Sequence, residues 1–226
     1  MTAVTFARIP PRRSTTRAAT WWGRAWVRAV EEAAYGESDL HAGRALSRSG
    51  GIGGITVDHG SVVAACYDRS GVWSVSATVP ELDPVSRRAF VEVVAGESGH
   101  LAALMAGELP HRLVEQAEEA GVELLPYGGE LGSSCTCDAW TDPCPHALAV
   151  MYQLAWLVEA DPFVLLHLRG LARDDLLARL HDRVGSPSPA EQEDPDVDVA
   201  VDAAMRAAAL LAELETEDIT STPTAS

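Results

Sequence analysis

Three of the chain's four cysteines stand beside a histidine in the stretch "SCTCDAWTDPCPHALAV", residues 134–150. The spacing is Cys135-x-Cys137-x6-Cys144-x-His146. Residues i and i+2 of a strand project to the same side, so the sulfurs of Cys135 and Cys137 are expected to face one point. Cys144 and His146 flank Pro145, where a helix is expected to begin, and the free N–H groups of a first helical turn favour a thiolate. Three thiolates and one imidazole form a closed tetrahedral set, which predicts one structural Zn²⁺ per chain.

Other uses of these residues fit less well. A disulfide between Cys135 and Cys137 requires Cα atoms closer than the roughly 6.5–7 Å that an extended strand places between them. A redox centre usually has Cys-x-x-Cys at the start of a helix, and a nucleophilic thiol needs an activating base with an orienting third group. A catalytic zinc ion keeps an open coordination position, whereas all four ligands are present here. The fourth cysteine, Cys66, is expected to pack in the core as a small apolar side chain.

The elements around this cluster must hold it in place. Apolar residues at helical spacing predict a helix from Thr20 to Gly36, and residues 48–82 read as an antiparallel meander with turns at "DHG" and "DRSG". Asp83-Pro84 and Asp161-Pro162 are typical helix starts. Further helices are expected at 99–106, from Pro110, from Pro145 and at 172–183, and short strands at 122–126 and 130–137.

These elements predict an α+β fold, with a small antiparallel β-meander, several helices, and a zinc-held ββα finger that leads into a helical segment. The expected organisation along the chain is a basic mobile arm at 1–19, an N-terminal α+β domain at 20–121, the finger with its following helices at 122–184, and an acidic disordered tail at 185–226 in which 198–214 can form a helix.

Composition bounds the class of protein. Of the 226 residues, 47% are hydrophobic, which suits one or two compact domains. No run of eighteen apolar residues occurs, and the first residues lack the apolar core and cleavage site of a secretory signal. We therefore expect a cytoplasmic protein that does not enter a membrane. Thiols stay reduced in that compartment, which favours a metal site over a disulfide.

Charge is unevenly distributed along the chain. The net charge is −16, and all 17 basic residues are arginines. Residues 1–30 hold six arginines and no acid, whereas residues 184–226 hold ten acids and one arginine. Such a chain repels phosphate over most of its surface.

The cysteine cluster resembles the SWIM-type zinc finger, whose signature is Cys-x-Cys, a variable gap, and Cys-x-His at a helix start. Cys135, Cys137, Cys144 and His146 carry the resemblance, and Trp140 matches an aromatic residue that often stands in the gap. "TWWGRAWVRAVE", "RSGGIGGITVDHGSV" and "DPFVLLHLRG" look like segments of stand-alone bacterial SWIM proteins, so the resemblance spans roughly residues 18–183. It implies a zinc-held ββα unit that binds DNA or proteins and accompanies SNF2-type ATPases, transposases or recombination proteins.

Three functions follow as hypotheses. The resemblance and the acidic surface favour a protein-interaction adaptor beside an SNF2-type ATPase or helicase, with Trp140 as a partner contact. Pro145 stands where related fingers often carry a basic residue, and 122–183 holds nine acids against four arginines, so contact with nucleic acid is expected to be weak or indirect.

The alternative is a nucleic-acid-binding module that uses the arm, with backbone contacts from arginines and base stacking on Trp21 and Trp22. The candidate arginines are Arg8, Arg12, Arg13 and Arg17. An enzyme is not expected, because the sequence holds no paired-carboxylate motif, nucleophile elbow or cofactor loop.

Overall fold

A five-stranded antiparallel sheet is the centre of the fold. The computed structural model describes residues 3–13, 18–185 and 205–206. In these residues the sheet has the order β1-β2-β3-β4-β5, so every strand pairs with its neighbour in sequence. The predicted meander and its two turns are confirmed, and with the helices they make the α+β fold that the sequence predicts. The strands are β1 (Val4–Phe6), β2 (Ile52–Asp58), β3 (Ser61–Tyr67), β4 (Val72–Thr78) and β5 (Gly132–Cys135).

The helices begin where capping residues stand. Thr20, Asp83 and Asp161 each accept a hydrogen bond from a backbone N–H group of the first turn that follows. The described helices are α1 (Trp21–Ala33), α2 (Glu37–Arg48), α3 (Pro84–Gly96), α4 (Ser98–Met105), α5 (His111–Glu119), α6 (Pro145–Ala160), α7 (Pro162–Leu168) and α8 (Arg173–Gly185), with a 3-10 turn η1 at Gly128–Glu130. None of the helices in the described residues has the length and apolarity needed to cross a bilayer.

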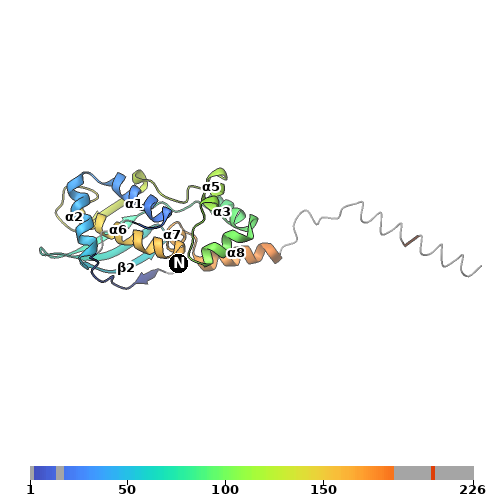
Figure 1. Cartoon of the computed structure of the whole chain (residues 1–226), viewed down its shortest axis with the longest axis horizontal. Coiled ribbons are helices and arrows are strands. Elements are labelled where there is room, and N and C mark those ends of the chain that lie inside the picture. The colour runs from blue at the N-terminus through green and yellow to red at the C-terminus, as the bar shows by residue number, and fades with distance from the viewer. Residues whose placement is uncertain (1–2, 14–17, 186–204, 207–226) are drawn as a thin grey trace, which may run out of the picture. The chain divides into compact units, whose positions relative to one another are not determined.

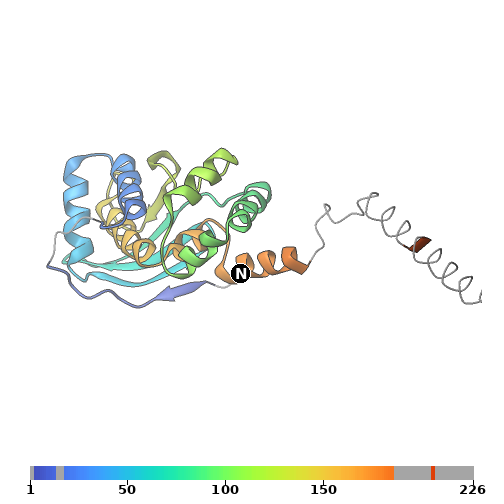
Figure 2. The ribbon, with the colours of Figure 1, turned by 45° about the vertical axis from the view of Figure 1, so that its right-hand side comes forward.

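One face of the sheet is covered by helices and the other is open. Figures 1 and 2 show α1, α2 and α6 on the same side of the sheet, with α6 lying against the strands. Along β3, Val62, Ala64 and Cys66 are buried under these helices, while Val63 and Tyr67 are exposed on the other face. This alternation is the pattern of a half-buried strand.

Helix α6 lies in the core of the molecule. It also follows directly after the predicted metal-binding loop, residues 136–143. Every residue from Ala147 to Ala155 is buried, as expected for a helix surrounded by other elements. Trp26 of α1 is fully buried against it and donates from Nε1 to the Met151 carbonyl at 3.1 Å. The start of α6 is therefore fixed by core packing.

Helix α2 was not expected from the sequence, because it has few large apolar residues. It packs on α6 through small ones. A Cβ atom at Gly43 would lie 2.7 Å from the Leu148 Cβ, so only glycine allows this approach of the two helices. Gln153 of α6 donates to the Ser47 carbonyl at 2.7 Å and adds a buried polar contact.

Three expectations about organisation need correction or restriction. Val4–Phe6 were placed in a mobile arm, but they form β1 and pair with β2, because Val4 and Phe6 alternate with Thr5 as a strand requires. Residues 122–126 were expected to form a strand but do not. The strand of the finger, β5, pairs instead with β4 of the meander.

The domain boundaries also differ. Met1–Leu180 form one compact unit, so no boundary between compact units falls at 121/122. A second unit begins at His181. The predicted disordered tail and helix 198–214 lie outside the described residues, apart from Met205 and Arg206, which are helical.

Candidate metal centre

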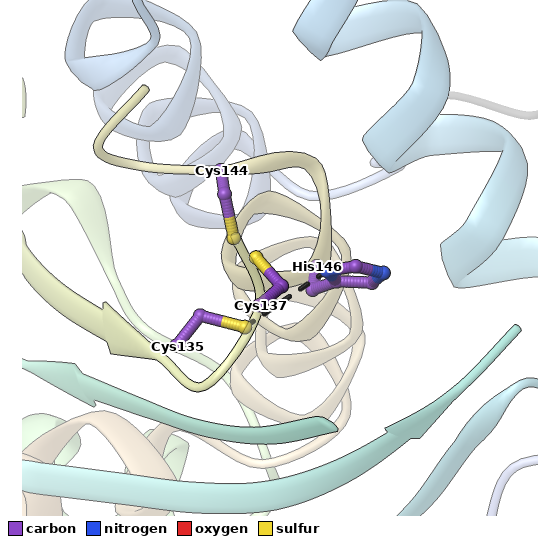
Figure 3. Close-up of side chains that lie close together, drawn as sticks. All are labelled: Cys135, Cys137, Cys144 and His146. Atoms are coloured by element: carbon purple, nitrogen blue, oxygen red, sulfur yellow. Dashed lines mark hydrogen bonds between the residues drawn. The ribbon is translucent and has the colours of Figure 1, made fainter. Parts of the chain in front are cut away.

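The four predicted ligands come from β5, the loop after it, and the start of α6. Cys135 is the last residue of β5 and pairs with Val75. Cys144 is the N-cap residue of α6, with Pro145 in the first turn and His146 next to it. Figure 3 shows the four side chains pointing toward one another. The sheet and the core helix thus bring together residues that the spacing alone only suggested.

The distances fit a tetrahedral zinc ion. The three Sγ atoms and the nearest His146 nitrogen all lie within 4.8 Å of one another. The Cys135 Sγ atom lies 3.9 Å from His146 Nδ1. Zn–S bonds of about 2.3 Å place tetrahedral sulfurs about 3.8 Å apart, so small side-chain movements complete the site. The set Cys135, Cys137, Cys144 and His146 is a structural zinc site of the Cys₃His type, and zinc supplies the cross-link that holds this loop.

Backbone N–H groups prepare the thiols for the metal. They hydrogen-bond to each ligand sulfur, from Cys137 to Cys135, from Ala139 to Cys137 and from Ala147 to Cys144. Such donors stabilise thiolate and offset the net charge of −1 that three thiolates leave around Zn²⁺.

The three thiols differ in pKa. Burial raises the pKa of Cys135 to about 12 and also raises the pKa of Cys144. At Cys137 burial is outweighed by hydrogen bonds from Ala139 and His146 and between the thiols, which lower the pKa to about 7. One thiol therefore ionises near neutral pH, and the other two lose their protons when the metal binds.

Asp68 is a site residue that the sequence analysis missed. Its carboxylate accepts a hydrogen bond from His146 Nε2 at 3.0 Å, which leaves Nδ1 to face the sulfurs. Metal-ligating histidines commonly hold their second nitrogen in this way. The carboxylate belongs to the turn between β3 and β4, and it also accepts from Ser70, Gly71 and Trp73. Hydrogen bonds from Ser70 and His146 hold the pKa of Asp68 well below its usual range, so it stays ionised.

Cys66 lies in the core of the sheet, as predicted. It is buried on β3, and burial raises its pKa to about 12. It is not among the ligand atoms that cluster within the described residues.

Trp140 lies in the loop between the two ligand pairs and is 78% exposed. Its ring packs edge-to-face on Tyr35, with centroids 4.9 Å apart. Tyr35 stands between α1 and α2 and is itself 69% exposed. This pair could not be predicted from local sequence patterns, because the two residues are 105 positions apart.

The candidate nucleic-acid residues are only partly free. Arg8 donates from Nε to the Gly50 carbonyl at 2.9 Å, and the Arg12 guanidinium lies 4.3 Å from the centre of the Trp156 ring. Arg13 is exposed, and Arg17 lies outside the described residues.

The expected base stacking on Trp21 and Trp22 is wrong for Trp22. Trp22 is 7% exposed and donates to the Val158 carbonyl. Trp21 is partly buried, donates to the Leu109 carbonyl and packs on His111.

This α+β fold with its closed Cys₃His set defines a zinc-finger protein. The model of a family described as "SWIM zinc finger" matches residues 118–155, which include all four ligands. Residues 118–155 are therefore similar to a SWIM zinc finger, which confirms the resemblance that the cysteine spacing indicated.

A wider similarity extends beyond the finger. The chain is 33% identical over 166 residues to a Mycobacterium tuberculosis protein named "Uncharacterized protein Rv2102". The alignment covers 72% of this chain and 59% of that relative, so the chain spans less than two thirds of the relative's length. No solved structure matches the chain.

Proposed function

We propose that this chain is a cytoplasmic, non-catalytic adaptor, held together by zinc, that binds a protein partner beside DNA. The partner we propose is an SNF2-type ATPase or helicase, or another component of DNA-processing machinery. The observation that carries the proposal is Trp140, a large apolar ring left 78% exposed on the loop that the zinc ligands hold. Aromatic side chains of this kind are enriched where proteins bind one another. A closed ligand set also leaves no coordination position for substrate.

The charge of the finger supports a protein partner over bare DNA. Between residues 122 and 168 the sequence contains acids but no arginine or lysine. Binding of a duplex at physiological salt depends on cations that neutralise phosphates. The finger itself therefore offers little to a DNA backbone.

The second candidate function is nucleic-acid binding through the N-terminal segment. It is favoured by a groove of about 660 Å³ beside His146, which Arg8, Tyr67 and Arg69 help to line. Two cations and one aromatic ring are the groups that bind single-stranded nucleic acid. We place this function second because Asp68 lines the same groove and Arg8 already binds a backbone carbonyl.

A pull-down from the protein's own cells tests the proposal. The tagged full chain is compared with Cys137→Ala, which removes a zinc ligand, and with Cys66→Ala, which removes a cysteine outside the ligand set. We expect the wild type and Cys66→Ala to recover an SNF2-type ATPase and Cys137→Ala to lose it. Sub-micromolar duplex binding by the purified protein, with no protein partner recovered, would contradict the adaptor and favour the second candidate.

A further inference from the structure

Two exposed aromatic rings form one small surface next to the zinc loop. Tyr35 and Trp140 touch edge-to-face at an interplanar angle of 76°, and both keep most of their surface in water. The two rings contact each other without being buried. We call these two side chains the aromatic pair. Aromatic side chains are enriched where proteins bind one another, so an exposed pair of them is a candidate contact site.

The backbone beside the aromatic pair is electronegative. Helix α1 ends at Ala33, two residues before Tyr35, and its last turn carries no basic residue. The last carbonyls of a helix carry a partial negative charge that attracts cations. The C-terminal end of α1 therefore favours a positive group near Tyr35.

Several carboxylates lie close to the aromatic pair in sequence. Asp138 and Asp142 each stand two residues from Trp140, and Glu37 stands two residues from Tyr35. Neither loop, at 34–36 and 138–143, contains an arginine or lysine. Glu31 and Glu32, in the last turn of α1, are paired with Arg44 and Arg28. Asp142 accepts a hydrogen bond from Ser133, which leaves Asp138 and Glu37 as the nearby acids for which the described residues provide no ion pair. The charge that complements this surface is positive.

The molecule also shows how it pairs rings with cations. Arg12 lies over Trp156 at 4.3 Å, Arg44 over Tyr152 at 5.7 Å and Arg173 over Phe163 at 5.3 Å. Among the described residues no such cation is recorded over the aromatic pair. A guanidinium supplied from outside can take the same position, because the ring faces attract it and the nearby carboxylates retain it.

We infer that the aromatic pair is the docking site for an arginine-bearing segment of the protein partner. This inference rests on the proposed function and names the chemistry that the partner presents. Trp140 lies between Cys137 and Cys144, so its place against Tyr35 depends on the loop that zinc holds. Docking is therefore expected to require zinc, although no partner atom touches the metal.

Fluorine NMR of the full chain tests the inference. The protein is labelled with 5-fluorotryptophan, and Trp140→Phe assigns the Trp140 signal among six tryptophans. The probe is a blocked Gly-Arg-Gly-Arg-Gly peptide, and the same peptide with glutamine in place of arginine is the control. We expect a saturable shift of the Trp140 signal with the arginine peptide, no shift with the glutamine peptide, and no shift after zinc is removed.

Two variants separate the aromatic pair from general effects. Tyr35 lies outside the finger, so Tyr35→Ala should still bind zinc. Its affinity for the arginine peptide should fall by about tenfold or more. Val85→Ala, at another exposed apolar side chain, should bind as the wild type does. Equal binding by Tyr35→Ala and the wild type would overturn the inference.

The remaining outcomes distinguish the inference from the proposed function. A Trp140 shift with duplex DNA but none with the arginine peptide would overturn the inference and assign the surface to nucleic acid. If Tyr35→Ala and Trp140→Ala recover the ATPase as the wild type does, the inference is overturned. The proposal that the protein is an adaptor is then unaffected. Peptide binding without any recovered partner would support the arginine site while contradicting the adaptor.

Discussion

The metal-binding loop and helix α6 are adjacent in sequence but are stabilised in opposite ways. From Ala147 to Ala155 every residue of α6 is buried, so burial of apolar surface holds it. From 136 to 142 the loop has no buried residue, although the ligands Cys135 and Cys144 flank it and Cys137 lies within it. The loop therefore depends on zinc and α6 on packing. A recognition surface can be built on such a loop because the metal, and not a core, keeps it in place.

Loss of a zinc ligand is expected to have the largest effect. Structural zinc contributes roughly 10–16 kcal/mol of binding free energy in isolated fingers, and 136–142 has little else to hold it. Cys137→Ala or His146→Ala should abolish binding of the one zinc ion per chain that we expect native mass spectrometry to find in the wild type, and should make residues 130–146 sensitive to protease. Because α6 is buried by α1 and α2, its helical core is expected to resist cleavage longer.

A wild-type protein that carries no zinc, or two ions, would contradict the ligand assignment. A loop that stays protease-resistant in Cys137→Ala would show that packing, and not metal, holds it.

A core substitution should give the opposite result. Trp26→Ala removes a fully buried ring and its hydrogen bond to the Met151 carbonyl, so the free energy of unfolding should fall by about 3–5 kcal/mol. Below its lowered melting temperature the variant should still bind one zinc ion. Denaturant unfolding with metal analysis measures both quantities. If Trp26→Ala loses bound zinc as well as free energy of unfolding, the metal-binding loop and the core around α6 are not stabilised independently.

Asp68→Asn tests whether the hydrogen bond between His146 and the Asp68 carboxylate strengthens zinc binding. An asparagine keeps the size of the side chain but lacks the charge that orients the imidazole, and outer-shell changes of this kind cost about 10–100-fold in metal affinity. Competition with a chelator gives the zinc affinity, and Co²⁺ spectra report whether the ligand geometry is kept. Asp58→Asn, at the end of β2 before the preceding turn of the meander, is the matched control and should bind zinc as the wild type does. Unchanged affinity in Asp68→Asn would show that the contact is incidental.

The ligands could be predicted from the sequence because their geometry is local. Cys135 and Cys137 share a strand end, and Cys144 and His146 share a helix start, so short-range periodicity carries the signal. The confirmed helix starts at Asp83 and Asp161 are local in the same sense. Asp68 is different, because the turn that carries it reaches His146 only through the pairing of β4 with β5.

The elements that the sequence analysis missed also depend on tertiary contacts. Helix α2 packs through Gly43, which reads as a weak helix former until α6 is placed beside it. Strand β1 has three residues, too few for alternation to be distinguished from an arm. The strand expected at 122–126 had the right composition but no partner, since β5 uses the edge of β4. Pairing partners far along the chain are what a single sequence does not reveal.

The smallest expected effect is that of Cys66→Ala, and it bears on the ligand assignment most directly. Cys66 is buried on β3 opposite Ile52 and Trp73, and burial raises its pKa to about 12, with smaller contributions from nearby Asp68, Cys144 and Cys137. A thiol this close to the cluster could replace His146 as a fourth ligand. Among the described residues, the Cys66 sulfur is not one of the ligand atoms that lie within 4.8 Å of one another. We therefore predict that Cys66 does not bind the metal. Cys66→Ala should therefore keep one zinc ion per chain and lose only packing energy, about 1 kcal/mol. Native mass spectrometry and denaturant unfolding measure the two effects, and loss of metal would mean that the site holds four thiolates and that His146 serves another purpose.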